Sequence, residues 1–264
     1  MKKFDELVNW FSDKGRVVVA LSGGVDSAVV AYAAKKALNG NAIAVTADYK
    51  TLSDEELVSA RKVAKEIGIT HKIIEYSELE NPEFVKNDEY RCFHCRSELA
   101  THLLEVAKQE DAKLIVDGTN ADDLDDFRPG IIALKENGVK SPLVELSIKK
   151  SDVRDIANEL SLSVFDKPSN ACLASRIPHG TEVTNDKLKR IEQAEIIVKK
   201  LFGVKQLRVR DHGEIARIEV GRDERHLLFD QAKLDELDIE LKKLGYKFVA
   251  IEAGGYRTGS LNVI

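Results

Sequence analysis

The chain contains few cysteines and no long hydrophobic segment, and both facts narrow the classes of protein to which it can belong. Its 264 residues include three cysteines, an odd number that does not suit a disulfide framework. No apolar run is long enough to cross a bilayer. Acidic residues interrupt the amino-terminal stretch Met1–Phe11, which is typical of a short amphipathic helix and not of a signal peptide. We therefore expect a cytoplasmic protein with no membrane contact.

The chain also has no excess of basic residues. Lys and Arg number 40 and Asp and Glu number 45, which gives a formal net charge of −5. This balance argues against a large nucleic-acid surface, although a local basic patch would be compatible with it. With 43% hydrophobic and 32% charged residues, the composition is that of an ordinary globular protein with one large domain or two modest ones.

The first half of the chain alternates strand-like and helix-like segments. Strands are predicted at Val17–Leu21, Ala42–Thr46, His71–Glu75 and Leu114–Val116, and helices at Asp26–Leu38, Asp54–Ile67, Cys95–Gln109 and Ser151–Leu160. Apolar, β-branched strands between amphipathic helices indicate an α/β fold with a doubly wound parallel sheet. Ser53 with Glu56 predicts a capping box, and Ser151 predicts an N-cap.

The pattern changes in the segment 166–180, which has two prolines and small polar residues and is predicted to be an irregular loop. Beyond it we expect a helix, two strands, a helix and a strand, at Asn185–Leu201, Gln206–Arg210, Ile215–Val220, Gln231–Leu244 and Lys247–Glu252, with a turn at 211–214. This order predicts a smaller α+β domain. We therefore divide the chain into domains at 1–167 and 168–264.

The most informative motif is Ser22-Gly-Gly-Val-Asp-Ser27, which lies between a predicted strand and a predicted helix. Such a loop forms a cradle for an anion, because glycines allow close approach and the helix start favours negative charge. Its spacing differs from the nucleoside-triphosphatase loop and from the dinucleotide fingerprint. It matches the signature of the PP-loop ATP pyrophosphatases, and a purely structural turn is the alternative. The residues predicted to bind ATP and the departing pyrophosphate are Ser22, Gly23, Gly24, Val25, Asp26 and Ser27.

A second loop, Asp117–Asp123, follows the predicted strand Leu114–Val116. Because ligands collect beyond the carboxyl ends of parallel strands, both loops are expected to face one crevice, and Gly118 is added to the predicted nucleotide site. Hard cations prefer carboxylate oxygen, so Asp26 and the acidic loop predict a Mg²⁺ and phosphate platform. A solvated acidic loop is the alternative. The acidic residues concerned are Asp122, Asp123, Asp125 and Asp126.

The three cysteines lie in two distant segments, as Cys92-Phe-His-Cys95 and Cys172. Three thiolates leave a structural zinc ion one ligand short, which His94 or His179 could supply. A cubane iron–sulfur cluster normally takes four cysteines, so three would leave one iron open to an exogenous sulfide. A redox pair at Cys92 and Cys95, or three unrelated buried thiols, are the alternatives.

Arg208 and Arg210 alternate along a predicted strand, so both side chains are expected on one face, with Val209 toward the core. Paired guanidinium groups suit phosphate recognition. The alternative is a pair of surface arginines that bind acids such as Glu219. Ser175 and Arg176, close to Cys172, could add to an anion pocket.

Taken together, several motifs resemble the LarE family. These proteins are ATP-dependent sulfur transferases in the synthesis of the nickel-pincer nucleotide, which is the cofactor of lactate racemase. The resemblance covers nearly the whole chain. Besides the Ser22–Ser27 loop, Cys172 and the Arg208-Val-Arg210 run, the motifs are Asp126–Gly130, Ser175–Gly180, Ile215–Glu219 and Gly254–Gly259.

The resemblance implies a nucleotide-like small-molecule substrate, pyridinium biscarboxylic acid mononucleotide, with ATP and Mg²⁺. A carboxylate would take AMP from ATP, and sulfur would then displace AMP to give a thiocarboxylate. Ser175, Glu195, Arg208 and Arg210 match positions associated with the substrate phosphate or a metal. A homo-oligomer is also implied, while the sulfur donor is not.

The family has two branches, and the cysteines decide between them. In one branch, the cysteine at the Cys172 position gives up its own sulfur and becomes dehydroalanine. Cys92 and Cys95 are absent from that branch, so this chain resembles the other, in which three cysteines hold a [4Fe-4S] cluster and the enzyme turns over repeatedly. The resemblance thus implies that Cys92, Cys95 and Cys172 are cluster ligands with a catalytic role in sulfide delivery.

Three other functions are compatible with parts of the pattern. A tRNA thiolation enzyme can combine a PP-loop with Cys-x-x-Cys and a distant cysteine, but the acidic balance and the lack of an RNA-binding extension argue against it. An amidating synthetase that uses ammonia would need no cysteines. A nucleotide sensor or scaffold would leave ATP intact.

Overall fold

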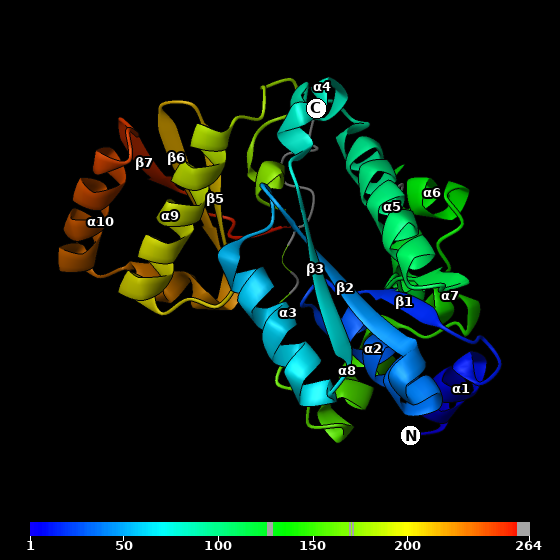
Figure 1. Ribbon diagram of the computed structural model, residues 1–264. Helices are drawn as coiled ribbons and strands as arrows, with labels where there is room; N and C mark the ends of the chain where they lie inside the picture. The colour runs from blue at the N-terminus through cyan, green and yellow to red at the C-terminus, as the bar shows by residue number, and fades with distance from the viewer. Residues whose placement is uncertain (126–128, 169, 171, 258–264) are drawn as a thin grey trace. The chain divides into compact units, whose positions relative to one another are not determined.

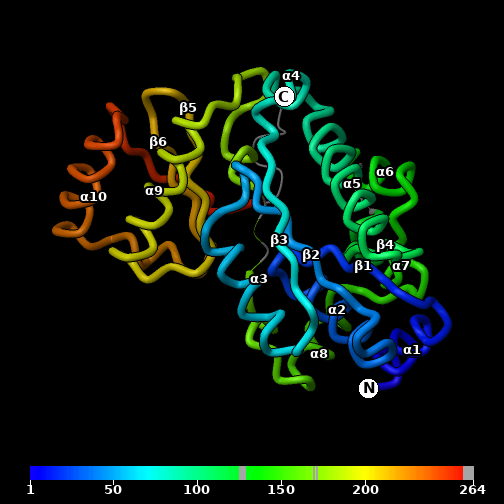
Figure 2. The backbone as a smooth tube through the Cα atoms, in the orientation of Figure 1, coloured from blue at the N-terminus to red at the C-terminus, as the bar shows by residue number. Residues whose placement is uncertain are grey.

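The computed structural model describes residues 1–125, 129–168, 170 and 172–257, which form two compact units. Unit 1 comprises Met1–Glu78 and Tyr90–Asn170, and unit 2 comprises Leu79–Glu89 and Ala171–Ile264. Figures 1 and 2 trace the backbone. The chain thus enters unit 2 at Leu79 and returns to unit 1 at Tyr90, before Cys92. It enters unit 2 a second time just before Cys172. The short first excursion, Leu79–Glu89, is not indicated by the sequence pattern.

Unit 1 is built on a parallel sheet with the strand order β3-β2-β1-β4. The strands are β1 (Val17–Ala20), β2 (Ala42–Tyr49), β3 (Thr70–Tyr76) and β4 (Leu114–Val116). The helices are α1 (Lys2–Phe11), α2 (Val25–Leu38), α3 (Asp54–Ile67), α5 (Arg91–Gln109), α6 (Pro129–Glu136), α7 (Pro142–Glu145) and α8 (Lys150–Glu159), with 3-10 turns η1 (Asn39–Asn41), η2 (Glu78–Glu80) and η3 (Ala121–Asp125).

Alternate side chains of the central strands enter two different hydrophobic cores. Val17 and Val19 of β1 pack with residues of α1, α2, α3 and α8, whereas Val18 packs with residues of α5 and α6. Helices therefore cover both faces of the sheet (Figure 1). The predicted α/β fold with a doubly wound parallel sheet is confirmed.

Unit 2 contains a smaller sheet with the strand order β5-β6-β7, in which β5 and β6 are antiparallel and β6 and β7 are parallel. Its elements are α4 (Pro82–Val85), η4 (Leu173–Arg176), α9 (Asn185–Phe202), β5 (Leu207–His212), β6 (Ile215–Val220), η5 (Arg222–Leu228), α10 (Gln231–Lys243) and β7 (Phe248–Ile251). Residues of α9 and α10 share a core with the sheet. The predicted α+β order is confirmed.

The excursion Leu79–Glu89 is held in unit 2 by hydrogen bonds to a segment about 90 residues later in the chain. The Asn87 side-chain amide donates to the carbonyl oxygens of Pro178 (2.8 Å) and Thr181 (2.7 Å). The Val183 N–H donates to the Val85 carbonyl (3.0 Å). These contacts are non-local, which is why local sequence patterns do not reveal them.

The ends of several elements differ from prediction. α5 begins at Arg91, so Cys92 is helical, and β5 continues to His212, so the turn is shorter than 211–214. The predicted irregular loop contains the short turn η4. Among the residues described, no helix has the length and apolar character needed to cross a bilayer.

Neither predicted capping interaction forms. Ser53 is the N-cap residue of α3, but its buried hydroxyl has no hydrogen-bond partner among the described residues. Glu56, the expected capping partner, accepts hydrogen bonds from Lys167 (2.9 Å) and Asn170 (3.1 Å) instead. The N-cap of α8 is Lys149 and not Ser151.

Candidate active site

The Ser22–Ser27 loop joins β1 to α2, in the predicted strand–loop–helix arrangement. The N-cap of α2 is Gly24, and no side-chain cap is found within the described part of the chain, so the first N–H groups can bind an anion. The buried Ser27 hydroxyl accepts a hydrogen bond from the Ser22 N–H (3.1 Å) and donates to the Gly24 carbonyl (3.1 Å). Ser27 therefore shapes the loop from within.

Gly23 is held at a position that only glycine fits. Its φ is +77°, and a Cβ there would lie 2.5 Å from the Glu56 carbonyl oxygen. The Gly23 carbonyl accepts hydrogen bonds from the Ser59 hydroxyl (2.9 Å) and the Lys167 ammonium (3.1 Å). The start of α3 and Lys167 thus fix the shape of the loop.

The Asp117–Asp123 loop packs directly on the first turn of α2. A Cβ at Gly118 would lie 2.6 Å from the Ser27 backbone nitrogen. The Asn120 side-chain amide donates to the Asp26 carboxylate (3.3 Å). The two loops predicted to form the nucleotide site are therefore brought together at the carboxyl ends of β1 and β4.

Several acidic side chains of this loop accept hydrogen bonds from the protein itself. They are Asp117, which accepts from Thr119 and Ser141, Asp122, which accepts from the Lys150 N–H, and Asp123, which accepts from the Asn120 N–H. Asp126 and the Asp125 side chain lie outside the described part of the chain. The Asp26 carboxylate, at the helix start, is of the chemical type that would hold Mg²⁺.

Gly118 allows a direct test of this packing. The Gly118→Ala variant is expected to bind ATP about tenfold more weakly, because about 1.4 kcal/mol lies within the usual effect of overpacking. Calorimetry with a non-hydrolysable ATP analogue would measure the change. The matched control is Gly40→Ala, since a Cβ at Gly40 meets no atom within 4 Å. Equal affinities of the two variants would contradict the proposed contact between loop and nucleotide site.

A short hydrogen-bonded chain connects β3 to the start of the PP-loop. The Thr46 hydroxyl donates to the Leu21 carbonyl oxygen (2.7 Å) and lies 2.8 Å from His71 Nε2. Since the hydroxyl proton is used, Nε2 carries a proton and donates to Thr46. Burial lowers the pKa of His71, and the nearby charge of Arg61 lowers it further.

This lowered pKa predicts a loss of stability in acid. Below the ordinary value of 6.5, the unfolded chain binds a proton that the folded state disfavours at His71. The free energy of unfolding should therefore fall as pH falls through this range, and less steeply in His71→Gln. Urea unfolding at about pH 7.5 and about pH 5.5 would measure both slopes. Identical slopes would show that His71 does not contribute.

Cys92 and Cys95 lie in the first turns of α5, three residues apart and so on one face. Cys92 is exposed, whereas the thiol of buried Cys95 lies 3.7 Å from Glu78 Oε1. Glu78 is fully buried and accepts a hydrogen bond from Thr51 (2.7 Å). Burial raises the pKa of Glu78, while the Thr51 hydrogen bond opposes this.

Cys172 belongs to unit 2, where it directly precedes η4 and is half-buried. Taken by itself, neither unit contains, among its described residues, three or more His, Cys, Asp or Glu side chains grouped to hold a metal ion. Cys92 and Cys95 belong to unit 1. The convergence of the three thiols therefore stays a prediction.

Arg176 fixes the turn that follows Cys172. It is fully buried, and its Nε and Nη2 bind the two carboxylate oxygens of Glu195 (2.8 and 3.1 Å). Its Nη1 donates to the Cys172 carbonyl (3.0 Å) and the Ser175 hydroxyl (3.1 Å). Glu195 thus binds groups of the protein interior, since it also accepts from the Val209 N–H (3.0 Å).

Arg208 and Arg210 lie on one face of β5, and Val209 between them is fully buried in the core of unit 2. Arg210 donates to Glu219 through Nε (3.0 Å) and Nη2 (2.8 Å), and to the Ser175 carbonyl (2.9 Å). The alternative of pairing with Glu219 is therefore right for Arg210, although the pair is buried and not on the surface.

Arg208 is buried in unit 2 near the charges of Arg176 and Glu195. It is 5% exposed, donates to the Leu207 carbonyl (2.5 Å) and lies over the Tyr256 ring, 5.1 Å from its centroid. Burial, and next the charge of Arg176, lower the pKa of Arg208 to about 10. A bound phosphate would offset both effects.

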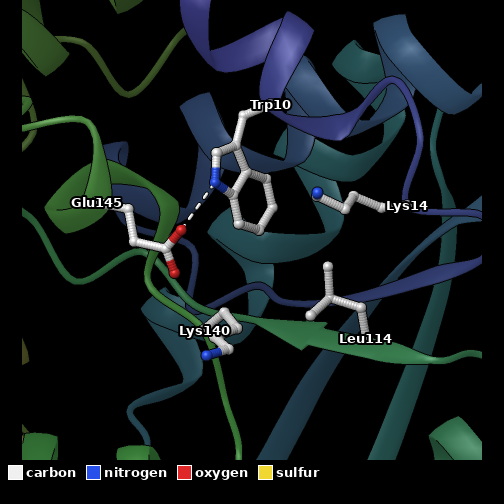
Figure 3. A pocket seen from close by; sticks show the side chains of 5 residues that line it. All are labelled: Trp10, Lys14, Leu114, Lys140 and Glu145. Atoms are coloured by element: carbon white, nitrogen blue, oxygen red, sulfur yellow. Dashed lines mark hydrogen bonds between the residues drawn. The ribbon is translucent and has the colours of Figure 1, made fainter.

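A separate cavity of about 270 Å³ is lined by Trp10, Lys14, Leu114, Lys140 and Glu145 (Figure 3). The Trp10 indole N–H donates to the Glu145 carboxylate there (2.9 Å). Leu114 begins β4, and Gly118 follows its other end. None of the predicted site residues lines this cavity, which is thus distinct from the predicted nucleotide site.

A parallel sheet whose first strand leads through Ser-Gly-Gly-x-Asp-Ser into an uncapped helix defines a domain of the PP-loop ATP pyrophosphatase class. Residues 9–124, which contain this loop, match the asparagine synthase family. An uncharacterised protein of Synechocystis is 41% identical over 98% of this chain and 97% of its own length. The pyridinium-3,5-bisthiocarboxylic acid mononucleotide synthase of Lactiplantibacillus plantarum is 33% identical over 97% of this chain and 92% of its own.

The chain belongs to the LarE family of ATP-dependent sulfur transferases, because this similarity extends over both of its units. A tRNA-specific 2-thiouridylase of Azorhizobium caulinodans is 30% identical, but over 59% of this chain and 49% of its own length. The resemblance read from the sequence motifs is confirmed at the level of the family.

Proposed function

We propose that the chain converts a carboxylate of pyridinium biscarboxylic acid mononucleotide into a thiocarboxylate in nickel-pincer nucleotide synthesis. The observation that carries this proposal is the identity of 33% to the Lactiplantibacillus synthase over 97% of the chain. A match confined to the PP-loop would support the use of ATP but no particular substrate.

Adenylation comes first, because hydrosulfide cannot displace oxide from a free carboxylate. A substrate carboxylate oxygen attacks the α-phosphorus of ATP, and the bond to pyrophosphate breaks. The N–H groups of Gly23, Gly24 and Val25 and the Ser22 hydroxyl bind the departing pyrophosphate. They stabilise its developing charge, and Asp26 would hold a Mg²⁺ ion that would neutralise part of the same charge.

Sulfide then attacks the carbonyl carbon of the acyl-adenylate, the C–S bond forms, and AMP leaves as the C–O bond to its phosphate breaks. We assign Cys92, Cys95 and Cys172 as thiolate ligands of a [4Fe-4S] cluster. The spacing of two thiols on one face of α5, and the half-buried position of Cys172 directly before η4, support this assignment. When bound by three thiolates, such a cluster supplies one iron with an open position for sulfide.

The substrate phosphate is assigned to Ser175, Arg208 and Arg210. The support is that Arg208 and Arg210 are buried on one face of β5, where Arg210, although paired with Glu219, also donates to the Ser175 carbonyl. Contacts to this phosphate, remote from the reacting carbon, use binding energy to position the carboxylate. Glu195 orients the same region through Arg176.

The test is a reaction of protein purified without oxygen with the pyridinium substrate, Mg²⁺, ATP and sulfide. One AMP and one pyrophosphate are expected for each thiocarboxylate, over repeated turnovers, with iron and acid-labile sulfide bound to the protein. Full activity of iron-free protein would contradict the cluster. Thiolated nucleosides in digested tRNA, with no reaction of the pyridinium substrate, would replace this function with tRNA thiolation.

A further inference from the structure

One lysine that the sequence motifs do not single out lies in contact with the PP-loop. Lys150 is the first residue of α8, which packs beside α2 in unit 1 (Figure 1). Its ammonium group binds the carboxylate of Asp26, the second residue of α2, and the two residues are 124 positions apart in the chain. Its backbone N–H donates to Asp122 (2.9 Å), in the second loop of the site.

The position of Lys150 works against the stability of α8. A cation at the first residue of a helix is disfavoured by the positive end of the helix dipole. The ion pair with Asp26 offsets part of this cost, because the two side chains are 31% and 20% exposed and water only partly screens their attraction. The stability of α8 alone therefore does not explain why a lysine stands here.

The same position suits a group that meets an incoming anion. Asp26 lies in the first turn of an uncapped helix that can hold pyrophosphate, so the Lys150 ammonium is already within reach of that site. Its flexible stem lets it change partners without a change of the backbone. The hydrogen bond from the Lys150 backbone N–H to Asp122 keeps the Lys150 backbone in place while the side chain moves.

We infer that Lys150 is a catalytic cation of the adenylation step, which exchanges the Asp26 carboxylate for the phosphates of ATP. This inference rests on the proposed function. Without nucleotide, Lys150 neutralises Asp26. With ATP bound, the Asp26 carboxylate would hold the accompanying Mg²⁺, and the Lys150 ammonium group would move to the phosphate oxygens. There it neutralises charge that grows on pyrophosphate as the bond to the α-phosphorus breaks.

The exchange predicts two opposite effects of one substitution. In Lys150→Met, the Asp26 carboxylate loses its resident cation, so Mn²⁺ alone should bind more tightly than in the wild type. The rate of AMP formation at saturating ATP should fall about 100-fold, as when one charge-stabilising donor is removed. Electron paramagnetic resonance of free Mn²⁺ measures the first effect, and chromatography of AMP measures the second.

Two further variants separate this role from a structural one. Lys150→Arg keeps the charge and should recover part of the rate. Lys149→Met removes the neighbouring exposed lysine and so changes the charge at the start of α8 by the same amount. It should change neither Mn²⁺ binding nor the rate of AMP formation. A wild-type rate in Lys150→Met would overturn the inference. So would a reduced rate with unchanged Mn²⁺ binding and no recovery in Lys150→Arg, which would make Lys150 merely structural.

Failure of the proposed function gives a different result. If the wild type formed no thiocarboxylate from the pyridinium substrate, the assigned substrate would be wrong. The comparison of Mn²⁺ binding, together with titrations of a non-hydrolysable ATP analogue, would still decide whether Lys150 and a metal compete for Asp26. If wild type and Lys150→Met bound Mn²⁺ with equal affinity, the proposed exchange of Lys150 for the metal at Asp26 would be overturned in that case as well.

Discussion

The Cys172→Ala variant is expected to form no thiocarboxylate while it still releases AMP and pyrophosphate from ATP. The groups assigned to adenylation lie in unit 1, and the substitution removes a single sulfur atom from unit 2. The backbone of the turn should persist, because the Cys172 carbonyl still accepts hydrogen bonds from Arg176 (3.0 Å) and the Ser175 N–H (3.0 Å). Chromatography of both products from one reaction would separate the two steps.

The other two cysteines supply the control for this result. If Cys172 gave up its own sulfur, Cys92→Ala and Cys95→Ala would each still complete one turnover. If three thiolates hold a cluster, each variant should lose bound iron and thiolated product together. Cys172→Ala protein that formed thiocarboxylate at the wild-type rate would contradict both mechanisms. The chain has no fourth cysteine to take over the role.

The strand–loop–helix arrangement around Ser22–Ser27 could be predicted from the sequence because its determinants are local. The strand, the glycines and the helix that follows are adjacent in the chain, and the parallel sheet places Gly118 at the same edge. Ser27 shows the limit of that reasoning. The motif marks it as a ligand of pyrophosphate, and only the structure shows that its hydroxyl also closes the loop between Ser22 and Gly24.

Side chains that bind distant partners could not be predicted in this way. Ser53 and Glu56 have the spacing of a capping box, but Glu56 binds Lys167, 111 residues later, and that contact overrides the local preference. For Lys150 the sequence offers one clue, because a lysine at the start of a helix is disfavoured by the helix dipole. Nothing local indicates that Asp26 is its partner.

The Arg176→Met variant is expected to lose about 3–5 kcal/mol of stability, as happens when one partner of a buried ion pair is removed. Arg176 is fully buried, and both carboxylate oxygens of Glu195 bind it. Methionine fills much of the volume but leaves the Glu195 charge in the interior without this partner. Urea unfolding would measure the loss. As a control, Lys242→Met breaks the exposed pair with Asp238 and should change stability by less than about 1 kcal/mol.

A double variant separates the charge from the geometry of the turn. Arg176→Met combined with Glu195→Gln removes both charges, and the glutamine oxygen can still accept from the Val209 N–H (3.0 Å in the native chain). It should regain most of the lost stability, because neutralising a buried pair costs far less than leaving one charge unpaired. A double variant as unstable as Arg176→Met would instead assign the loss to the contacts of Nη1 and to packing.

The activity of the same double variant then tests whether Arg176 positions Cys172. Both variants lack the Nη1 hydrogen bonds to the Cys172 carbonyl and the Ser175 hydroxyl. If these bonds hold the thiol in place, the double variant should be stable and release AMP, yet form little thiocarboxylate. If sulfur transfer returned together with stability, the arginine would be needed only to neutralise Glu195. The turn that carries Cys172 would then keep its shape through the remaining backbone contacts, such as that of the Ser175 N–H.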